Sequence, residues 1–142
     1  MKPSEKWDPE LLKIAKLLVK SGGVVWDVGA NVGLFSKAAA VRAGPNGRTV
    51  SLEADIDAVA LLNCTIRLPS KDHAEMTVIP LALGKSPGFV RFAIAKRARA
   101  ANAIEGHGST QTGGTLEIRT LPCVTLDSLL DHFPPPDVLQ PG

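Results

Sequence analysis

Apolar residues recur at helical spacing near the start of the chain. Between residues 8 and 20 they fall three and four positions apart, with lysines on the remaining side. Asp8 and Pro9 are typical of a helix start, and Gly22-Gly23 is typical of a helix end. The next run, Val24–Val28, is short and largely β-branched. It predicts a buried parallel strand, because helices on both faces of a sheet leave a strand without a polar side.

The alternation of helical and strand-like patterns continues beyond this first strand. Helical patterns cover residues 32–43 and 56–68, and apolar strand-like runs cover residues 49–53 and 77–84. Strands and helices that alternate in this way predict an α/β fold around a parallel sheet. The third predicted strand contains Pro80, which has no N–H to donate to a neighbouring strand. We therefore expect this strand at an edge of the sheet.

The second half of the chain has a different pattern. Residues 89–95 and 116–124 indicate two strands of an added β-hairpin, and a segment rich in Gly, Ser and Thr, residues 106–115, indicates a loop between them. Thr125 is predicted to cap a short helix. The apolar residues within 137–140 indicate a fourth strand for the main sheet.

The loop after the first strand carries the candidate chemistry. It reads acid-x-Gly-x-Asn-x-Gly, from Asp27 to Gly33. Its glycines allow a ligand to approach the backbone, and the following helix offers free N–H groups. A dinucleotide-binding loop would have glycine where Asn31 and Leu34 stand, and a P-loop would continue with Lys-Ser/Thr. An acid before the glycines favours a ligand with an ammonium group over a pyrophosphate.

A second acid, Glu53, ends the second predicted strand. Its distance from the first loop is typical of the acid that binds the ribose hydroxyls of a nucleoside in a βαβ unit. A Glu at the end of a strand is more often simply exposed. Its combination with the glycine-bearing loop favours the ribose role here.

The glycine-bearing loop resembles motif I of class I S-adenosylmethionine (SAM)-dependent methyltransferases. Its form, Asp-Val-Gly-Ala-Asn-Val-Gly over residues 27–33, is similar to that of the FkbM family. Residues 82–84 (Ala-Leu-Gly) and 125–127 (Thr-Leu-Asp) are similar to later segments of the family. The resemblance implies a Rossmann-like fold with strand order 3-2-1-4, SAM as the cofactor, and methyl transfer to an oxygen of a small-molecule or sugar-type acceptor. It implies that the cofactor is bound by Asp27, Gly29, Ala30, Asn31, Gly33, Glu53, Ala54 and Ala82.

Two positions depart from what the resemblance implies. The family commonly has Glu-Pro where this chain has Glu53-Ala54. Many class I enzymes carry an acid for the adenine amino group where Ala82 stands, so only the backbone could serve there. Family members also continue past the fourth strand with a segment that carries active-site residues, whereas this sequence reads Gln140-Pro141-Gly142. No catalytic residue is predicted.

These departures leave alternatives open. We expect residues 1–142 to form a single, incomplete methyltransferase domain, and whether it is an active enzyme stays open. One alternative is a catalytically inactive, SAM-binding or structural remnant. A weaker one is an NAD(P)-binding oxidoreductase. An exposed edge on the fourth strand would also favour self-association, because unpaired backbone groups template strand pairing.

Charge and composition limit the classes of binding partner that we expect. The net charge of +2 is too small to indicate a polyanion, and the basic segment 96–99 is expected to be an exposed loop. Cys64 and Cys123 are predicted to be free, buried thiols, and no spacing suggests a metal site. The sequence shows neither a signal peptide nor a run that could span a bilayer. We therefore expect a cytoplasmic protein with no metal, nucleic-acid or membrane partner.

Overall fold

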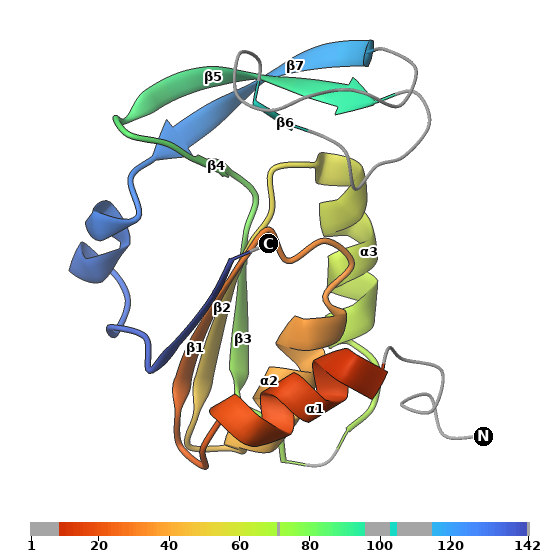
Figure 1. Cartoon of the computed structure of the whole chain (residues 1–142), viewed down its shortest axis with the longest axis vertical. Coiled ribbons are helices and arrows are strands. Elements are labelled where there is room, and N and C mark those ends of the chain that lie inside the picture. Colours follow the sequence, from red (N-terminus) through yellow and green to blue (C-terminus); the bar gives the residue numbers. More distant parts are fainter. Residues whose placement is uncertain (1–8, 71, 96–102, 105–114, 142) are drawn as a thin grey trace. The chain divides into compact units, whose positions relative to one another are not determined.

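The chain divides into two compact units. The computed structural model describes residues 9–70, 72–95, 103–104 and 115–141. The first unit comprises Met1–Ile79 and Pro134–Gly142, and the second comprises Pro80–Phe133. Figure 1 labels the helices and strands of both units.

The first unit is built on a parallel sheet of four strands. Their order is β3-β2-β1-β8, and every neighbouring pair is parallel. The strands are β1 (Val24–Val28), β2 (Arg48–Leu52), β3 (Glu75–Ile79) and β8 (Val138–Pro141). Since β8 contains most of the predicted fourth strand, the predicted α/β class and the order 3-2-1-4 are both confirmed.

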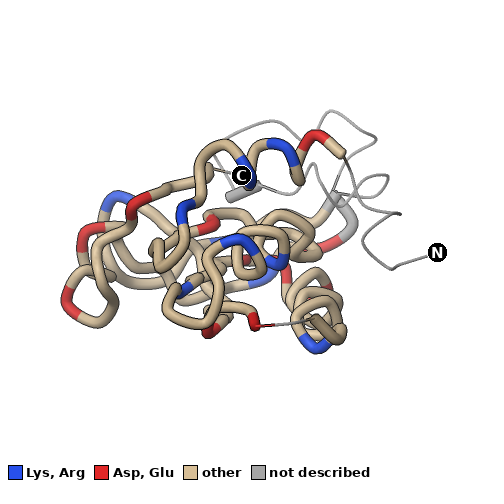
Figure 2. The backbone as a smooth tube through the Cα atoms, turned by 90° about the horizontal axis from the view of Figure 1, so that it is seen from below, with Lys and Arg blue, Asp and Glu red and all other residues tan. Residues whose placement is uncertain are grey.

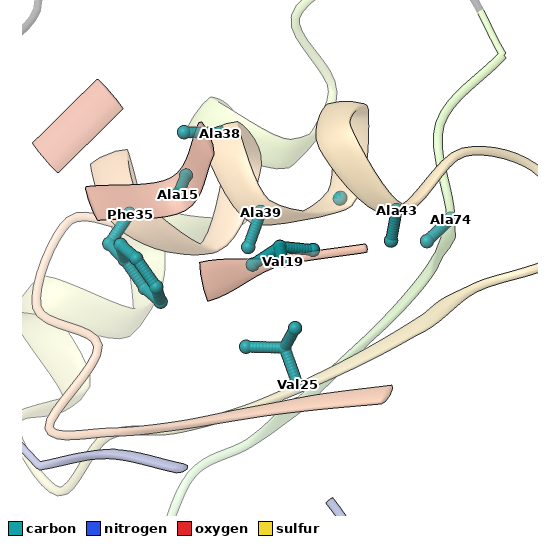
Figure 3. Close-up of a cluster of buried hydrophobic side chains, with 9 residues drawn as sticks. Ala15, Val19, Val25, Phe35, Ala38, Ala39, Ala43 and Ala74 are labelled. Carbon is teal, nitrogen blue, oxygen red and sulfur yellow. The ribbon is translucent and has the colours of Figure 1, made fainter. Parts of the chain in front are cut away.

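Helices of the first unit lie on one side of this sheet (Figure 1). They are α1 (Pro9–Leu18), α2 (Leu34–Ala43) and α3 (Ile56–Ile66). The buried core between sheet and helices contains Val25 of β1 and Phe35 of α2, with alanines filling much of the remaining space (Figure 3). Because side chains alternate along a strand, Asp27 lies on the same face of β1 as Val25 and so points toward the helices.

The helices are shorter than their patterns predicted. The structure ends α1 at Leu18, and the predicted cap Asp8 lies outside the described residues. Along α3 the buried residues are Ala58 and Leu62, which are one turn apart. Leu61, predicted to face inward, is 56% exposed. Cys64 is a free thiol but an exposed one, which corrects its predicted burial, because only one narrow face of α3 meets the sheet.

The prediction of one continuous strand over residues 77–84 is wrong. Strand β3 ends at Ile79, and the following β4 (Ala82–Leu83) pairs with β7 (Thr115–Val124) in the second unit. Pro80 lies between them. It has no N–H to donate to a neighbouring strand, and it restricts the backbone conformation of the residue before it. The predicted edge position is confirmed, since β3 pairs only with β2 among the described strands.

The second unit contains the predicted hairpin. Its sheet has the order β4-β7-β5-β6, and its long antiparallel pair is β5 (Gly88–Ala95) with β7 (Thr115–Val124). The short β6 spans Ala103–Ile104. Most of the loop predicted between the hairpin strands lies outside the described residues. The basic segment 96–99 also lies outside them.

A single helical turn follows β7. It is a 3-10 helix, η3 (Asp127–Asp131), rather than an α-helix. The Oγ1 atom of Thr125 accepts a hydrogen bond from the backbone N–H of Ser128 at 3.2 Å. The N-cap position itself is Leu126, one residue after the predicted one, and its side chain makes no capping bond. Thr125 nevertheless satisfies a backbone donor of the first turn.

Acidic and basic residues are interspersed along the described part of the chain (Figure 2). Within the same residues, no three His, Cys, Asp or Glu side chains gather as they would around a metal ion. None of the described helices is both long enough and apolar enough to cross a membrane.

Candidate functional site

A tight loop joins β1 to α2, and hydrogen bonds attach it to the neighbouring strand. The backbone N–H groups of Gly29 and Ala30 both donate to the carbonyl of Leu52, at 2.8 and 3.0 Å. Gly29 and Asn31 have positive φ angles of 69° and 54°. Glycine adopts this region at no steric cost, and Asn is one of the few other residues that tolerates it. The loop glycine and asparagine are therefore required by the turn itself.

Gly33 closes the loop by packing rather than by lining a cavity. Its φ is +85°, and a Cβ atom added there would lie 2.3 Å from Cδ1 of Leu62. No ordinary contact is that short, so a side chain at this position would force either Leu62 or the start of α2 to shift. The glycine allows the start of α2 to approach α3.

Asp27 is a buried carboxylate at the end of β1. It is 3% exposed, and its Oδ2 atom accepts a hydrogen bond from the hydroxyl of Ser36 at 2.5 Å. The Ser36 Oγ in turn accepts from the hydroxyl of Ser51 at 2.7 Å. Burial raises the pKa of Asp27 to about 6, the Ser36 hydrogen bond opposes that rise, and the nearby charge of Glu53 adds to it. The site therefore holds a carboxylate whose negative charge, when ionised, attracts a cationic ligand.

Glu53 fixes the middle of the loop to the end of β2. Its Oε1 accepts from the backbone N–H of Asn31 at 2.7 Å, and its Oε2 accepts from the N–H of Asp55 at 2.9 Å. A carboxylate has about four acceptor sites, so two backbone bonds leave it able to accept from a ligand. The two acids predicted from the sequence thus lie at the carboxyl ends of neighbouring strands. Glu53 bonds the loop itself, and Asp27 bonds Ser36 in the helix that follows the loop.

A pocket of about 220 Å³ opens beside Asp27. It lies at the carboxyl ends of β1 and β8, where the strand order changes direction and where ligands of open α/β sheets bind. This is the position predicted for the ligand from the strand order. The pocket is lined by Leu11, Asp27, Gly29, Ala30, Asn31, Val32, Leu34, Phe35, Gln140 and Pro141.

The structure gathers some of the predicted site residues and separates others. Half of the eight line this pocket: Asp27, Gly29, Ala30 and Asn31. Three more belong to the same unit but not to the pocket lining: Gly33, Glu53 and Ala54. Ala82 is buried in β4 of the second unit, where it pairs with Cys123.

Sequence reasoning missed several residues of the site. Leu11, Phe35 and Gln140 line the pocket although they come from α1, α2 and β8. The serines behind Asp27 were also missed, but the register offers a signal for one of them. Ser51 lies directly opposite Asp27 in the β1–β2 pair, so both side chains point to the same face.

A second pocket, of about 380 Å³, lies at the opposite end of β1. Its one acid, Asp137, already accepts a hydrogen bond from the backbone N–H of Val24 at 2.8 Å and returns one from its own N–H to the Val24 carbonyl. That side chain therefore anchors β8 to β1. The smaller pocket at Asp27 has the more suitable chemistry for a charged ligand.

A parallel sheet with this strand order, and an acid and a glycine-bearing loop at its switch point, defines a Rossmann-like α/β fold of the methyltransferase type. Residues 27–140 match the family described as the methyltransferase FkbM domain. Because that match covers well over half of the sequence, the chain belongs to the FkbM methyltransferase family. Comparison with curated proteins finds no match.

Proposed function

We propose that this chain binds SAM at the β1–α2 loop and belongs to an enzyme that transfers a methyl group to an oxygen of a small-molecule or sugar-type acceptor. The observation that carries the proposal is the buried carboxylate of Asp27 on the wall of the pocket. Membership of the FkbM methyltransferase family supports it independently.

The charge of the pocket discriminates between candidate ligands. The methionyl end of SAM carries an ammonium group, which an ionised carboxylate attracts strongly in a partly buried site. The pyrophosphate of NAD would instead be repelled by the same charge. The pocket volume of about 220 Å³ is below the roughly 300–1,000 Å³ of complete ligand sites. It therefore suits the amino-acid end of SAM better than the whole molecule.

Glu53 is proposed to accept hydrogen bonds from the ribose diol. Its carboxylate is held by two backbone N–H groups, so its direction is fixed before a ligand arrives. Preorganised acceptors lose little entropy on binding. The contacts proposed for Ala54 and Ala82 stay predictions.

When bound, SAM supplies a methyl group on a positively charged sulfonium. The chain's contribution is to bind and orient it, because an in-line transfer depends mainly on positioning. An oxygen acceptor also needs a group that removes its proton. Among the described histidines, the Nδ1 atom of His73 lies 2.8 Å from the backbone oxygen of Ala74, which fits a structural role. We assign no base.

Calorimetric titration with SAM, and separately with NAD⁺, tests the proposal. SAM should bind, and Asp27→Asn and Glu53→Gln should each weaken its binding by roughly tenfold to a hundredfold, because each removes a charge-assisted hydrogen bond. Asp131→Asn, an exposed acid of η3, is the matched control and should leave affinity unchanged. Binding of NAD⁺ without binding of SAM would overturn the assignment.

A further inference from the structure

Two buried serines form a hydrogen-bonded relay behind Asp27. Ser36 of α2 and Ser51 of β2 are both 0% exposed. The Ser51 hydroxyl donates to Ser36 Oγ at 2.7 Å, and the Ser36 hydroxyl donates to Asp27 Oδ2 at 2.5 Å. Both protons therefore point toward the carboxylate. Hydrogen bonds in such a chain polarise one another, and this polarity stabilises a negative charge on Asp27.

Other charged groups around Asp27 do not replace this relay. Among the residues that the structure describes, no Lys, Arg or His forms an ion pair with Asp27. Lys37, the neighbour of Ser36 on α2, donates instead to the carbonyl of Ile66 at 3.1 Å. From β8, the residue opposite Asp27 is the uncharged Gln140.

The remaining elements near the site add no compensating positive charge. On α1, the exposed Lys13 pairs with the exposed Glu10 at 3.4 Å. At the end of β2, Glu53 adds a negative charge that raises the pKa of Asp27. On α2, Arg42 donates to the carbonyl of Val19. The hydroxyl of Ser36 is therefore the group that most directly favours the ionised carboxylate.

We propose that Ser36, itself held by Ser51, is a positioning residue that keeps Asp27 ionised and thereby sets the lowest pH at which the pocket retains an ammonium-bearing ligand. The identity of that ligand rests on the proposed function, whereas the charge state of Asp27 does not. With the Asp27 pKa raised to about 6, the charge is sensitive to small changes near neutral pH. Loss of the hydrogen bond from the Ser36 hydroxyl should therefore protonate a large fraction of the carboxylate near neutral pH, while the Ser36 backbone N–H continues to favour the ionised form.

The titration of Asp27 in the ligand-free protein is the first test. Its carboxyl carbon would be followed by ¹³C NMR in the wild type and in Ser36→Ala, Ser51→Ala and Thr49→Val. Ser36→Ala should raise the midpoint by roughly one to two pH units, because hydrogen bonds to charged groups are worth that much. Ser51→Ala should raise it less, since it acts through Ser36.

Thr49→Val is the matched control. Thr49 lies on the same strand and the same face as Ser51, it is 0% exposed, and its hydroxyl has no hydrogen-bond partner among the residues that the structure describes. This change removes a buried hydroxyl that belongs to no relay, so the Asp27 midpoint should not move. An unchanged midpoint in Ser36→Ala, or an equal shift in Thr49→Val, would overturn the inference.

The second test is calorimetry across about pH 5 to 8 with SAM and with 5′-methylthioadenosine, which lacks the ammonium group. SAM affinity should fall about tenfold per pH unit below the Asp27 midpoint, and that fall should begin at higher pH in Ser36→Ala. Binding of 5′-methylthioadenosine should depend little on pH in either protein. A shifted Asp27 titration without SAM binding would support the relay and overturn the proposed function. SAM binding with an unshifted pH profile in Ser36→Ala would support the proposed function and overturn the relay.

Discussion

At the scale of single residues, Asp27 shows a conflict between stability and binding. Its folded-state pKa of about 6 exceeds the ordinary value of 3.8, so the folded protein binds more protons between these pH values than the unfolded chain does. The free energy of unfolding therefore falls as pH rises through this window. The loss of stability that comes from burying the ionised carboxylate is fully present above about pH 6, and it is relieved as pH falls toward 3.8.

Asp27→Asn should make this penalty measurable. The variant keeps the shape of the side chain but carries no charge, so it should be more stable than the wild type at pH 7, by up to about 3 kcal/mol. The difference should shrink as the pH approaches 4. Urea denaturation at several pH values measures it. A variant less stable than the wild type by the same amount at every pH would show that shape, rather than charge, dominates at this position.

Two glycines allow the cost of backbone conformation to be separated from the cost of a clash. Gly22 and Gly33 have similar φ angles of +78° and +85°, but an added Cβ meets nothing within 4 Å at Gly22 and meets Leu62 at 2.3 Å at Gly33. Gly22→Ala should cost about 1–2 kcal/mol from backbone strain alone. Gly33→Ala should cost about 1–3 kcal/mol more from overpacking.

Denaturation of both alanine variants gives the two free energies of unfolding. Equal losses at Gly22 and Gly33 would mean that Leu62 moves aside without cost, and would remove the packing role assigned to Gly33. At the residue scale, the sequence predicted a tight glycine-bearing turn in this loop, whereas its ligand contacts stay predictions. The conformations that Gly29, Asn31 and Gly33 adopt depend on local backbone sterics, which the residue types themselves specify.

At the scale of elements, α3 begins at a cap that the sequence pattern left unnoticed. Asp55 is the N-cap, its side chain accepts from the N–H of Asp57 at 2.9 Å, and it is 3% exposed. Asp55→Ala should lower the free energy of unfolding by about 1 kcal/mol or more, whereas Asp55→Asn should retain most of the stability. Thermal and urea denaturation measure both. An alanine variant as stable as Asp55→Asn would show that the capping bond contributes nothing.

Element boundaries were the least predictable feature. Pro80 was interpreted correctly as the sign of an edge strand, yet the pattern extended that strand through Ala82 and Leu83. Apolar residues on both sides of a proline look alike in sequence, whichever sheet they pair with. The inward face of α3 was misjudged for a similar reason. Leu61 and Leu62 are equally apolar, and only packing against the sheet buries one of them.

At the scale of the whole chain, β8 pairs with β1 and with no other described strand. A strand edge without a partner presents backbone groups that can pair with another strand. We propose that the 142-residue chain self-associates through this edge. Leu139, which is 45% exposed, adds an apolar contact that favours association. The short length of β8 limits the pairing, and so does Pro141, which has no N–H to donate.

Light scattering over a concentration series tests this proposal. The average mass of the wild type should rise with concentration, and Leu139→Lys should suppress the rise, because charged residues protect sheet edges. Leu61→Lys is the matched control, since Leu61 is similarly exposed, at 56%, but lies on α3. A wild-type chain that stays monomeric at every concentration, or equal suppression by both lysine variants, would contradict association through β8.

Sequence patterns were enough to predict the α/β class and the loop at the end of β1, because periodicity indicates the elements and residue types limit the backbone of the turn. The strand order was predicted from the resemblance to the FkbM family, and the sheet confirms it. Which side chains lie around Asp27 depends instead on tertiary packing. Four different elements contribute Ser36, Ser51, Gln140 and Leu11. The sheet register and the packing of helices bring the two serines behind Asp27, and place Gln140 and Leu11 on the wall of the same pocket. Such contacts arise between residues distant in sequence, so no local pattern encodes them.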